Sequence, residues 1–354
     1  MRKIGLFLIL FLIICTGYTF IFPNQPYSFP KLKYFPQMPE ADNNLVTVEG
    51  VKLGRYLFYD PILSSDSTMA CGSCHKQEFA FSDSPNKFSK GRNEIAMVRN
   101  TLPLFNLAWY PALFWDGKAK SIEDQIAHPI KSKDEMNLEF KIIVNRLSKN
   151  GLYKNLFYKA FGTTQIDSIK VCYAISQFLR TLISYQSKYD RVISGNGSFS
   201  NDEFEGYIIV NDQTKGDCLH CHTTDADALG TTLKFSNNGL DAVSNPSEYK
   251  DKGRGLITSQ ITDNGKFKIP SLRNLLFTSP YMHDGRFKTL NEVLDFYSEG
   301  VNNCVNIDSK MEFVHQKGNK LTSSEKQKVI AFLKTLSDSV FITNPEFSNP
   351  FQNN

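Results

Sequence analysis

Two short cysteine–histidine motifs constrain this chain more than any other feature of its sequence. CGSCH at 71–75 and CLHCH at 218–222 share the pattern C-x-x-C-H. Two thiols on one turn of chain can add to the two vinyl groups of a haem, and the histidine that follows can then bind the iron. Zinc would need four ligands, but no second cysteine pair lies near either motif, and a redox dithiol does not need the histidine. The sequence therefore predicts two covalently bound haems of the c type.

The motifs also assign the ligand on one side of each iron. The predicted attachment and ligand residues are Cys71, Cys74 and His75 for the first haem, and Cys218, Cys221 and His222 for the second. His220 falls at a variable position of the second motif, and we interpret it as a surface histidine.

The chain is long enough for two domains, and each half contains one motif. Its 354 residues are 41% hydrophobic and 13% aromatic, which is enough for packed cores. We expect an N-terminal haem domain at 46–190, a C-terminal haem domain at 200–340 and a tail at 341–354. The net charge of +4 comes from mixed charges without a long basic run, so we expect no nucleic-acid partner.

The first 22 residues predict export from the cytoplasm. Arg2 and Lys3 precede an apolar run that ends at Phe22. Basic residues stay on the cytoplasmic side, so the rest of the chain is expected in the periplasm. The run is either a membrane anchor or a cleaved signal, and the protein is then anchored or soluble. A proline-rich tether, residues 23–45, follows it.

Helical periodicity and capping residues predict a mostly α-helical chain. Asp167 is expected to cap a helix whose apolar face runs from Val171 to Leu182. Thr289 and Thr322 are each followed three residues later by a glutamate, and these capping boxes predict two more helices.

Four longer segments resemble the bacterial di-haem cytochrome c peroxidase and MauG family. They are LGRYLFYDPILSSDSTMACGSCH, FWDGKAKSIEDQIAHPIKSKDEM, GDCLHCH and FKIPSLRNLLFTSPYMHDGRFKTLNEVLDFY. They cover the chain from about residue 46 to 336 in the order of the family. The resemblance implies two cytochrome c-like domains that face each other across a calcium-containing interface.

The resemblance also implies a catalytic set downstream of the FWDG sequence. Gln125, Pro129 and Glu135 match it in type and spacing. Cleavage of the O–O bond of a peroxide needs a group that moves a proton from one oxygen to the other. We expect Glu135 to be this acid/base, Gln125 to orient the peroxide and Pro129 to shape the pocket.

The first iron is expected to keep an open position opposite His75. Many members of the family carry a histidine in the loop after the first motif that blocks this position. Here no histidine occurs between His75 and His128. Met97 is the alternative ligand in that loop, and we interpret His128 as a neighbouring or exposed histidine.

The second iron is expected to have a protein ligand on both sides. In classical members a methionine lies fourteen residues beyond the histidine of the H-D-G sequence, and here that position is Tyr297. A tyrosine at this position is a MauG-like feature, and a phenolate stabilises ferric iron. Met282 is the alternative ligand, and His283 is interpreted as structural.

Three further roles follow from the resemblance. Trp115 is expected to connect the two haems electronically, whereas Trp109 packs in a core. Arg273 is expected to pair with a haem propionate. The predicted calcium ligands, which include side-chain and backbone oxygens, are Asn100, Thr278 and Pro280.

The sequence therefore predicts an oxidoreductase that reduces hydrogen peroxide to water with electrons from an external donor, such as a small cytochrome c. Two alternatives are a MauG-like enzyme that uses peroxide to modify a partner protein, and an electron-transfer cytochrome without catalysis. Cys172 and Cys304 are left over, either as a disulfide or as two free thiols.

Overall fold

The computed structural model describes residues 25–41, 43–224 and 228–352. The predicted export segment, residues 1–22, lies outside the described residues. Within those ranges, no helix combines the length and the apolar character that a membrane span requires.

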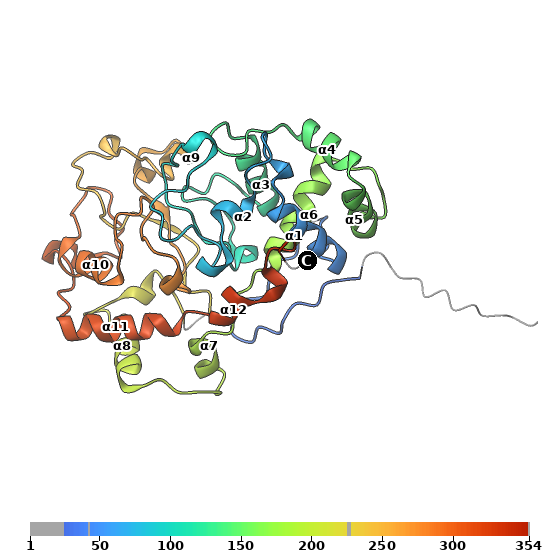
Figure 1. The fold of residues 1–354 in the computed structure, drawn as a ribbon. Coiled ribbons are helices and arrows are strands. Elements are labelled where there is room, and N and C mark those ends of the chain that lie inside the picture. Colours follow the sequence, from blue (N-terminus) through green and yellow to red (C-terminus); the bar gives the residue numbers. More distant parts are fainter. Residues whose placement is uncertain (1–24, 42, 225–227, 353–354) are drawn as a thin grey trace, which may run out of the picture.

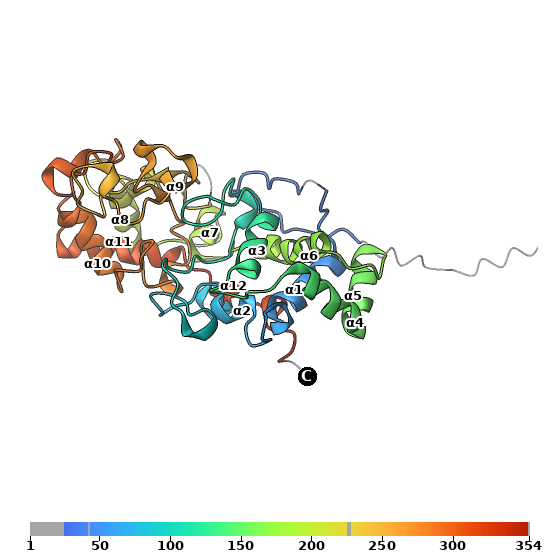
Figure 2. The ribbon, with the colours of Figure 1, turned by 90° about the horizontal axis from the view of Figure 1, so that it is seen from above.

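The described chain is mostly α-helical, as predicted, and its two halves lie side by side (Figures 1 and 2). The helices of the N-terminal half are α1 (Val48–Tyr59), α2 (Cys71–Cys74), α3 (Ile122–Lys131), α4 (Phe140–Lys149), α5 (Gly151–Phe161) and α6 (Ser168–Thr181). Those that follow are α7 (Lys188–Ile193), α8 (Asn201–Asn211), α9 (Gly255–Thr258), α10 (Leu290–Asp295), α11 (Ser323–Thr335) and α12 (Ser339–Thr343). A two-stranded antiparallel sheet pairs β1 (Phe235–Ser236) with β2 (Phe267–Lys268).

A pair of helices that cross at a glycine forms the centre of each half. In the N-terminal half α1 packs against α6, and in the C-terminal half α8 packs against α11. A methyl group on Gly54 would lie 1.9 Å from the carbonyl oxygen of Ala174, and one on Gly206 would lie 1.9 Å from that of Lys328. Only glycine therefore allows either pair of helices to approach so closely.

The capped helices form where the sequence predicts them. The side chain of Asp167 accepts a hydrogen bond from the N–H of Lys170 at the start of α6. Thr289 and Thr322 form complete capping boxes before α10 and α11. The apolar faces of α6 and α11 are buried in the cores of the two halves.

The helix that carries Tyr297 does not continue as an α-helix. The α-helical part ends at Asp295, and Phe296–Gly300 form a π-helical turn. A π turn contains one extra residue, so it rotates the following side chains relative to the α-helical period, and such turns are frequent at functional sites. Phe296 is buried and Tyr297 is half-buried next to it.

The proline-rich segment lies against both halves. Within residues 25–41, the carbonyl of Pro36 accepts a hydrogen bond from Trp109 Nε1 at 3.0 Å. The carbonyl of Tyr34 accepts one from the N–H of Ala228 at 2.8 Å. This segment is therefore bound to the folded protein along its length and is more than a spacer.

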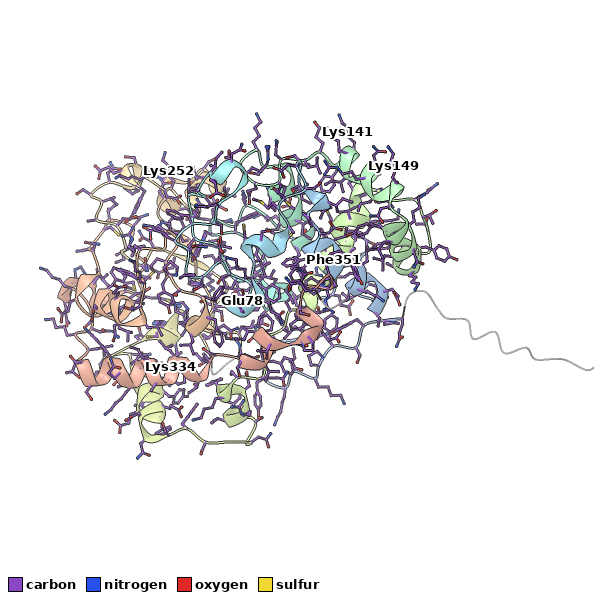
Figure 3. All side chains as sticks on the ribbon, in the orientation of Figure 1. Glu78, Lys141, Lys149, Lys252, Lys334 and Phe351 are labelled. Atoms are coloured by element: carbon purple, nitrogen blue, oxygen red, sulfur yellow. The ribbon has the colours of Figure 1, made fainter. Side chains whose placement is uncertain are left out.

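The last residues of the chain return to the N-terminal half. Phe341 and Phe347 are buried in its core, and α12 lies beside α1 in Figure 1. Phe351 lies edge-on to Tyr56 of α1, with 5.2 Å between the ring centres (Figure 3). Residues 341–352 therefore complete the first domain, although they follow the second in sequence.

Candidate functional site

The first motif forms helix α2 and presents its histidine with a defined tautomer. His75 Nδ1 lies 2.7 Å from the carbonyl oxygen of Phe81. A carbonyl only accepts, so Nδ1 carries the hydrogen and Nε2 keeps its lone pair for a metal. Burial lowers the pKa of His75, which also favours the neutral imidazole that binds iron.

A cavity opens beside this motif, and it and the solvent-filled space at its mouth together contain about 720 Å³ that protein atoms do not fill. Cys71, Cys74 and His75 all line it. Two thiols and an imidazole nitrogen on one wall of a largely apolar cavity fit a covalently attached haem. These residues would hold the porphyrin and bind its iron from one side.

The predicted catalytic residues line the same cavity. Gln125 and Pro129 come from α3, and Glu135 comes from the loop that follows it. Pro129 has no N–H, so the carbonyl of Gln125 lacks its usual helical hydrogen bond from the residue four positions later. The structure therefore brings the amide of Gln125 and the carboxyl of Glu135 next to the haem-binding residues, from which they are 50 to 64 residues away in sequence.

Glu135 has the environment of a proton-transfer group. Its partial burial raises the pKa of the carboxyl, whereas a hydrogen bond from Ser132 and the positive charge of Lys118 lower it. Burial prevails, so the pKa of Glu135 lies above the usual value of 4.5. A carboxyl tuned upward in this way exchanges protons more readily near neutral pH.

His75 is the one histidine among the described residues that line this cavity. His128 points elsewhere, because its ring lies edge-on to Phe114 with 5.4 Å between centres and its side chain is 40% exposed. Met97 lines the cavity and is the soft side chain from the loop after the motif.

The second motif holds its histidine in the same manner. His222 Nδ1 lies 2.8 Å from the carbonyl oxygen of Pro270, so Nε2 is again the free nitrogen. Burial lowers the pKa of His222 to about 4. Cys218 and Cys221 are free thiols on the preceding turn, and they fit covalent attachment of a second haem.

Both candidate ligands for the second iron are joined by one amide. Asn238 Nδ2 donates to the hydroxyl of Tyr297 at 2.9 Å and lies 3.8 Å from the sulfur of Met282. Burial raises the pKa of Tyr297 to about 12, and the hydrogen bond from Asn238 acts in the opposite direction. An N–H donor of this kind stabilises a phenolate, so Asn238 favours the form of tyrosine that binds ferric iron.

Trp115 lies where the two halves meet. Its Nε1 donates to the carbonyl oxygen of Asn100 at 2.8 Å, and its ring lies edge-on to His283 at 6.4 Å. The ring of His283 is stacked on Phe267 with 3.6 Å between centres. Trp109 instead packs with Ile183 in a separate core cluster, as predicted.

An ionic cluster also joins the two halves. Arg99 binds Asp116 of its own half at 2.6 Å and Asp251 of the other half at 2.7 Å. Burial would raise the pKa of Asp251, but hydrogen bonds from Arg99 and from the N–H of Gly253 lower it. This cluster holds the junction next to Trp115.

The residues expected to bind calcium lie at the same junction. The N–H of Asn100 donates to the carbonyl of His283 at 2.7 Å, and this brings Asn100 next to the segment that contains Thr278 and Pro280. Asn100 Nδ2 is bound to the carbonyl of Lys87 at 3.0 Å. No cluster of three or more His, Cys, Asp or Glu suited to a metal occurs in the described ranges. A calcium ion here would be held by carbonyl and amide oxygens.

Arg273 is fully buried and already has protein partners. Its guanidinium binds the carboxylate of Asp190 and the carbonyl of Ala228, and its Nε has no partner among the described residues. The predicted contact with a propionate would therefore be made by Nε.

The two remaining cysteines are free thiols, which decides between the two expected alternatives. Cys172 is buried in the N-terminal core. Cys304 lies in the other half, where its sulfur is 3.4 Å from Asn237 Nδ2.

Several residues of the two sites have no signal in the sequence. Asn238 lies in a polar loop, and only the fold places it against Tyr297. Arg99 and Asp251 are 152 residues apart, so their pairing is not visible in the sequence either. Lys268 lies inside the segment FKIPSLRN, where nothing in the neighbouring residues indicates that it is buried.

Comparison with known proteins agrees with this description of two c-type haem sites. The family model "Di-haem cytochrome c peroxidase" matches residues 48–198. The methylamine utilization protein MauG of Methylophilus methylotrophus is 32% identical over 309 residues, which are 86% of this chain and 88% of that protein. The cytochrome c551 peroxidase of Nitrosomonas europaea is 32% identical over 303 residues, which are 84% of this chain and 82% of that protein.

A solved structure resembles the whole described fold. It is a MauG-like protein associated with microbial copper homeostasis, with a TM-score of 0.82, 32% identity, and coverage of 92% of this chain and 99% of that one. The sites define a di-haem protein of the c type. The chain belongs to the di-haem cytochrome c peroxidase and MauG family.

Proposed function

We propose that this protein reduces hydrogen peroxide to water with electrons from an external donor, as a di-haem c-type peroxidase. One observation carries the proposal: the cavity beside the first motif contains the haem-binding residues together with Glu135 and Gln125. An electron-transfer cytochrome needs no acid/base group and no amide above its iron. When bound, the haem supplies an iron that accepts peroxide and changes its oxidation state.

Glu135 and Gln125 act on the peroxide itself. The amide of Gln125 orients it by hydrogen bonding. The carboxylate of Glu135 takes the proton from the near oxygen and returns it to the departing oxygen, which leaves as water. Pro129 shapes the pocket: it has no N–H, so the backbone carbonyl of Gln125 is left without its helical hydrogen bond.

Trp115 is the proposed electronic connection between the two haems. Its indole donates to the carbonyl of Asn100 and lies edge-on to His283, at the junction of the halves. His222 and Tyr297 would hold the iron of the second haem, with Met282 as the alternative to Tyr297. We infer further that the two haem domains face each other across a calcium ion at Asn100, Thr278 and Pro280, and that Arg273 contacts a propionate.

The proposed location is the periplasm. The basic residues and apolar run of residues 1–22 support export and leave open both an anchored and a soluble form. A small cytochrome c is the proposed electron donor.

Replacement of Glu135 by glutamine tests the catalytic assignment. Glu135→Gln keeps the shape of the side chain but cannot exchange a proton, so kcat for peroxide reduction should fall by about 10²–10⁴-fold. The assay is the peroxide-dependent oxidation of reduced cytochrome c. A pyridine haemochrome assay, which should report two haems in both proteins, is the control.

Glu139→Gln is a matched control variant, because Glu139 is exposed just before α4. Equal activity of Glu135→Gln and wild type would remove Glu135 from the mechanism. EPR of the resting protein should show one high-spin and one low-spin ferric haem, and two low-spin haems in every redox state would rule out a peroxidase.

A second candidate is a MauG-like enzyme that uses peroxide to modify residues of a partner protein. The contact between Tyr297 and Asn238 favours it, because a stabilised phenolate helps the second haem to hold an oxidising equivalent. In that case the protein reacts with peroxide but turns over reduced cytochrome c slowly. Rapid turnover of cytochrome c supports the peroxidase.

A further inference from the structure

Lys268 is a buried amine that has no opposite charge among the described residues. Only 5% of its surface is exposed, and its Nζ lies 3.4 Å from the centre of the Tyr110 ring. Burial lowers the pKa of Lys268 to about 7, and no carboxylate in the described part of the chain opposes this shift. The partly buried guanidinium group of Arg99 and the buried one of Arg273, by contrast, each have an aspartate partner.

A charge buried without a partner is strongly unfavourable, so a buried lysine usually has an anion nearby. The face of Tyr110 attracts a cation, but it provides no negative charge. A bound anionic group beside Lys268 would therefore stabilise the charged form of the amine.

The position of Lys268 indicates which anion this is. Its backbone N–H donates to the carbonyl of Trp115 at 2.8 Å. Two residues later, the carbonyl of Pro270 holds the ring of His222. The preceding side chain, Phe267, is stacked on His283, and successive side chains of a strand point to opposite faces. Lys268 thus lies between the backbone of Trp115 and the segment that orients the second proximal histidine.

We propose that Lys268 is the counter-charge of a haem propionate at the junction of the two halves, and that it raises the reduction potential of the haem that carries this propionate. The proposal rests on the proposed function only in requiring two attached haems. Each haem has two propionate carboxylates. A buried propionate needs a hydrogen-bond donor or a positive charge beside it. A fixed ammonium beside a propionate disfavours the additional positive charge of ferric iron, so it favours the ferrous form.

Spectroelectrochemistry of Lys268→Met tests this. Loss of the ammonium should lower the equilibrium constant for reduction of one haem about tenfold, as expected for one charge at roughly 10 Å with an effective dielectric constant of about 20. This corresponds to about 59 mV for a one-electron couple. EPR at each potential identifies whether the shifted haem is the one bound by His75 or by His222.

Lys234→Met is the matched control. Lys234 is exposed, and its carbonyl binds the N–H of Ile269, beside the small sheet that contains Lys268. The variant removes one positive charge close to the same sheet, but solvent screens the charge of Lys234. The equilibrium constant for reduction of either haem should therefore change by less than twofold. Lys268→Arg keeps the charge and should retain the wild-type potentials.

Three results would overturn the proposal while leaving the peroxidase intact. These are unchanged potentials in Lys268→Met, an equal shift in Lys234→Met, or a shift in Lys268→Arg as large as in Lys268→Met. Failure of the proposed function looks different, because the wild type would then lack two haems or would not react with peroxide.

Lys268→Gln replaces Lys268→Met if the latter does not retain both haems. If neither neutral variant retains them, the resonance Raman bending band of the propionates in the wild type and in Lys268→Arg decides. Arginine offers two N–H groups in place of one, so the band should shift, and an identical band in both proteins would refute the contact.

Discussion

At the residue scale, a single backbone carbonyl fixes the tautomer of each histidine that we propose as an iron ligand. Phe81 and Pro270 accept the Nδ1 hydrogen of His75 and His222 at 2.7 and 2.8 Å. Each contact fixes the tautomer and the ring orientation, and it makes the other nitrogen a better donor to a metal. The same logic applies to Asn238, whose N–H donates to the hydroxyl of Tyr297 and would stabilise its phenolate.

Also at this scale, the pKa of Glu135 predicts the pH dependence of peroxide reduction. Glu135 acts as a base only when ionised, and burial raises its pKa above 4.5, so kcat/KM should fall at acid pH with a midpoint above that value. Lys118 lowers this pKa, so Lys118→Met should move the midpoint upward by a fraction of a pH unit, because Lys118 is exposed and screened.

The measurement is kcat/KM against pH at low ionic strength. Lys120→Met, which removes a neighbouring exposed charge, is the control and should leave the midpoint in place. A downward shift in Lys118→Met would contradict the assignment of the acid limb to Glu135.

At the element scale, each half is built on a close helix crossing that depends on one glycine. A glycine in the helix before each haem motif, Gly54 or Gly206, lies directly against a carbonyl of the partner helix. The close approach lets α1 pack on α6 and α8 on α11 over their whole buried faces. The turn Phe296–Gly300 is a second device at this scale, since it redirects Tyr297 out of the α-helical period.

The crossing of α8 and α11 predicts a large effect of one methyl group. Gly206→Ala places Cβ 1.9 Å from the carbonyl oxygen of Lys328, so the helices must separate. The free energy of unfolding should fall by about 1–3 kcal/mol. Urea unfolding followed by circular dichroism measures it.

Gly151→Ala is the matched control, because a methyl group on Gly151, at the start of α5, would have no neighbouring atom within 4 Å. It should be neutral or slightly stabilising. Equal stability of the two variants would show that the α8–α11 crossing tolerates a wider separation than the backbone contact indicates.

At the scale of the whole molecule, residues distant in sequence hold the two halves together. Arg99 links Asp116 to Asp251 across the junction. The carboxylate of Asp338, which is buried after α11, accepts from the N–H groups of Tyr185 and Gln186 at 2.9 Å. The segment 25–41 and the last residues of the chain add contacts at either end.

Removal of the central cation should destabilise this junction. Arg99→Met leaves the carboxylate of Asp116, with 7% of its side chain exposed, without its partner. We expect a loss of about 3 kcal/mol in the free energy of unfolding. Because Arg99 lowers the pKa of Asp251, the ionised form of Asp251 contributes stability above pH 3.8. The difference in free energy of unfolding between Arg99→Met and wild type should therefore become smaller as the pH falls below this value.

Thermal and urea unfolding at pH 7 and pH 3 measure this effect. Lys328→Met removes an exposed ion pair with Glu205 and serves as the control, with an expected loss much smaller than that of Arg99→Met. A loss in Arg99→Met no larger than in Lys328→Met would show that the ionic cluster does not hold the halves together.

Local patterns made much of this protein predictable. Each haem motif can be recognised from the sequence, because its two thiols and its histidine lie within five residues and are close together before any tertiary contact forms. The capping of α6, α10 and α11 is equally local. The residues Gln125, Pro129 and Glu135 were predicted from family spacing, and they do line one cavity with the first motif.

The remaining features depend on contacts between distant segments. Lys268 and Asn238 look like ordinary polar residues in the sequence, and only the fold buries one beside Tyr110 and directs the other at Tyr297. The sequence left the pairing of Cys172 and Cys304 open, and the structure places these thiols in different halves.

The sequence alone predicted where two haems would attach, and it determined which residues cap the helices, because both depend on groups a few residues apart. Tertiary structure decided that Phe341 and Phe347 pack in the first domain, that Arg99 joins the halves and that Lys268 is buried without a carboxylate among the described residues. The physical reason is that burial and charge pairing depend on distances in space, which a one-dimensional pattern does not contain.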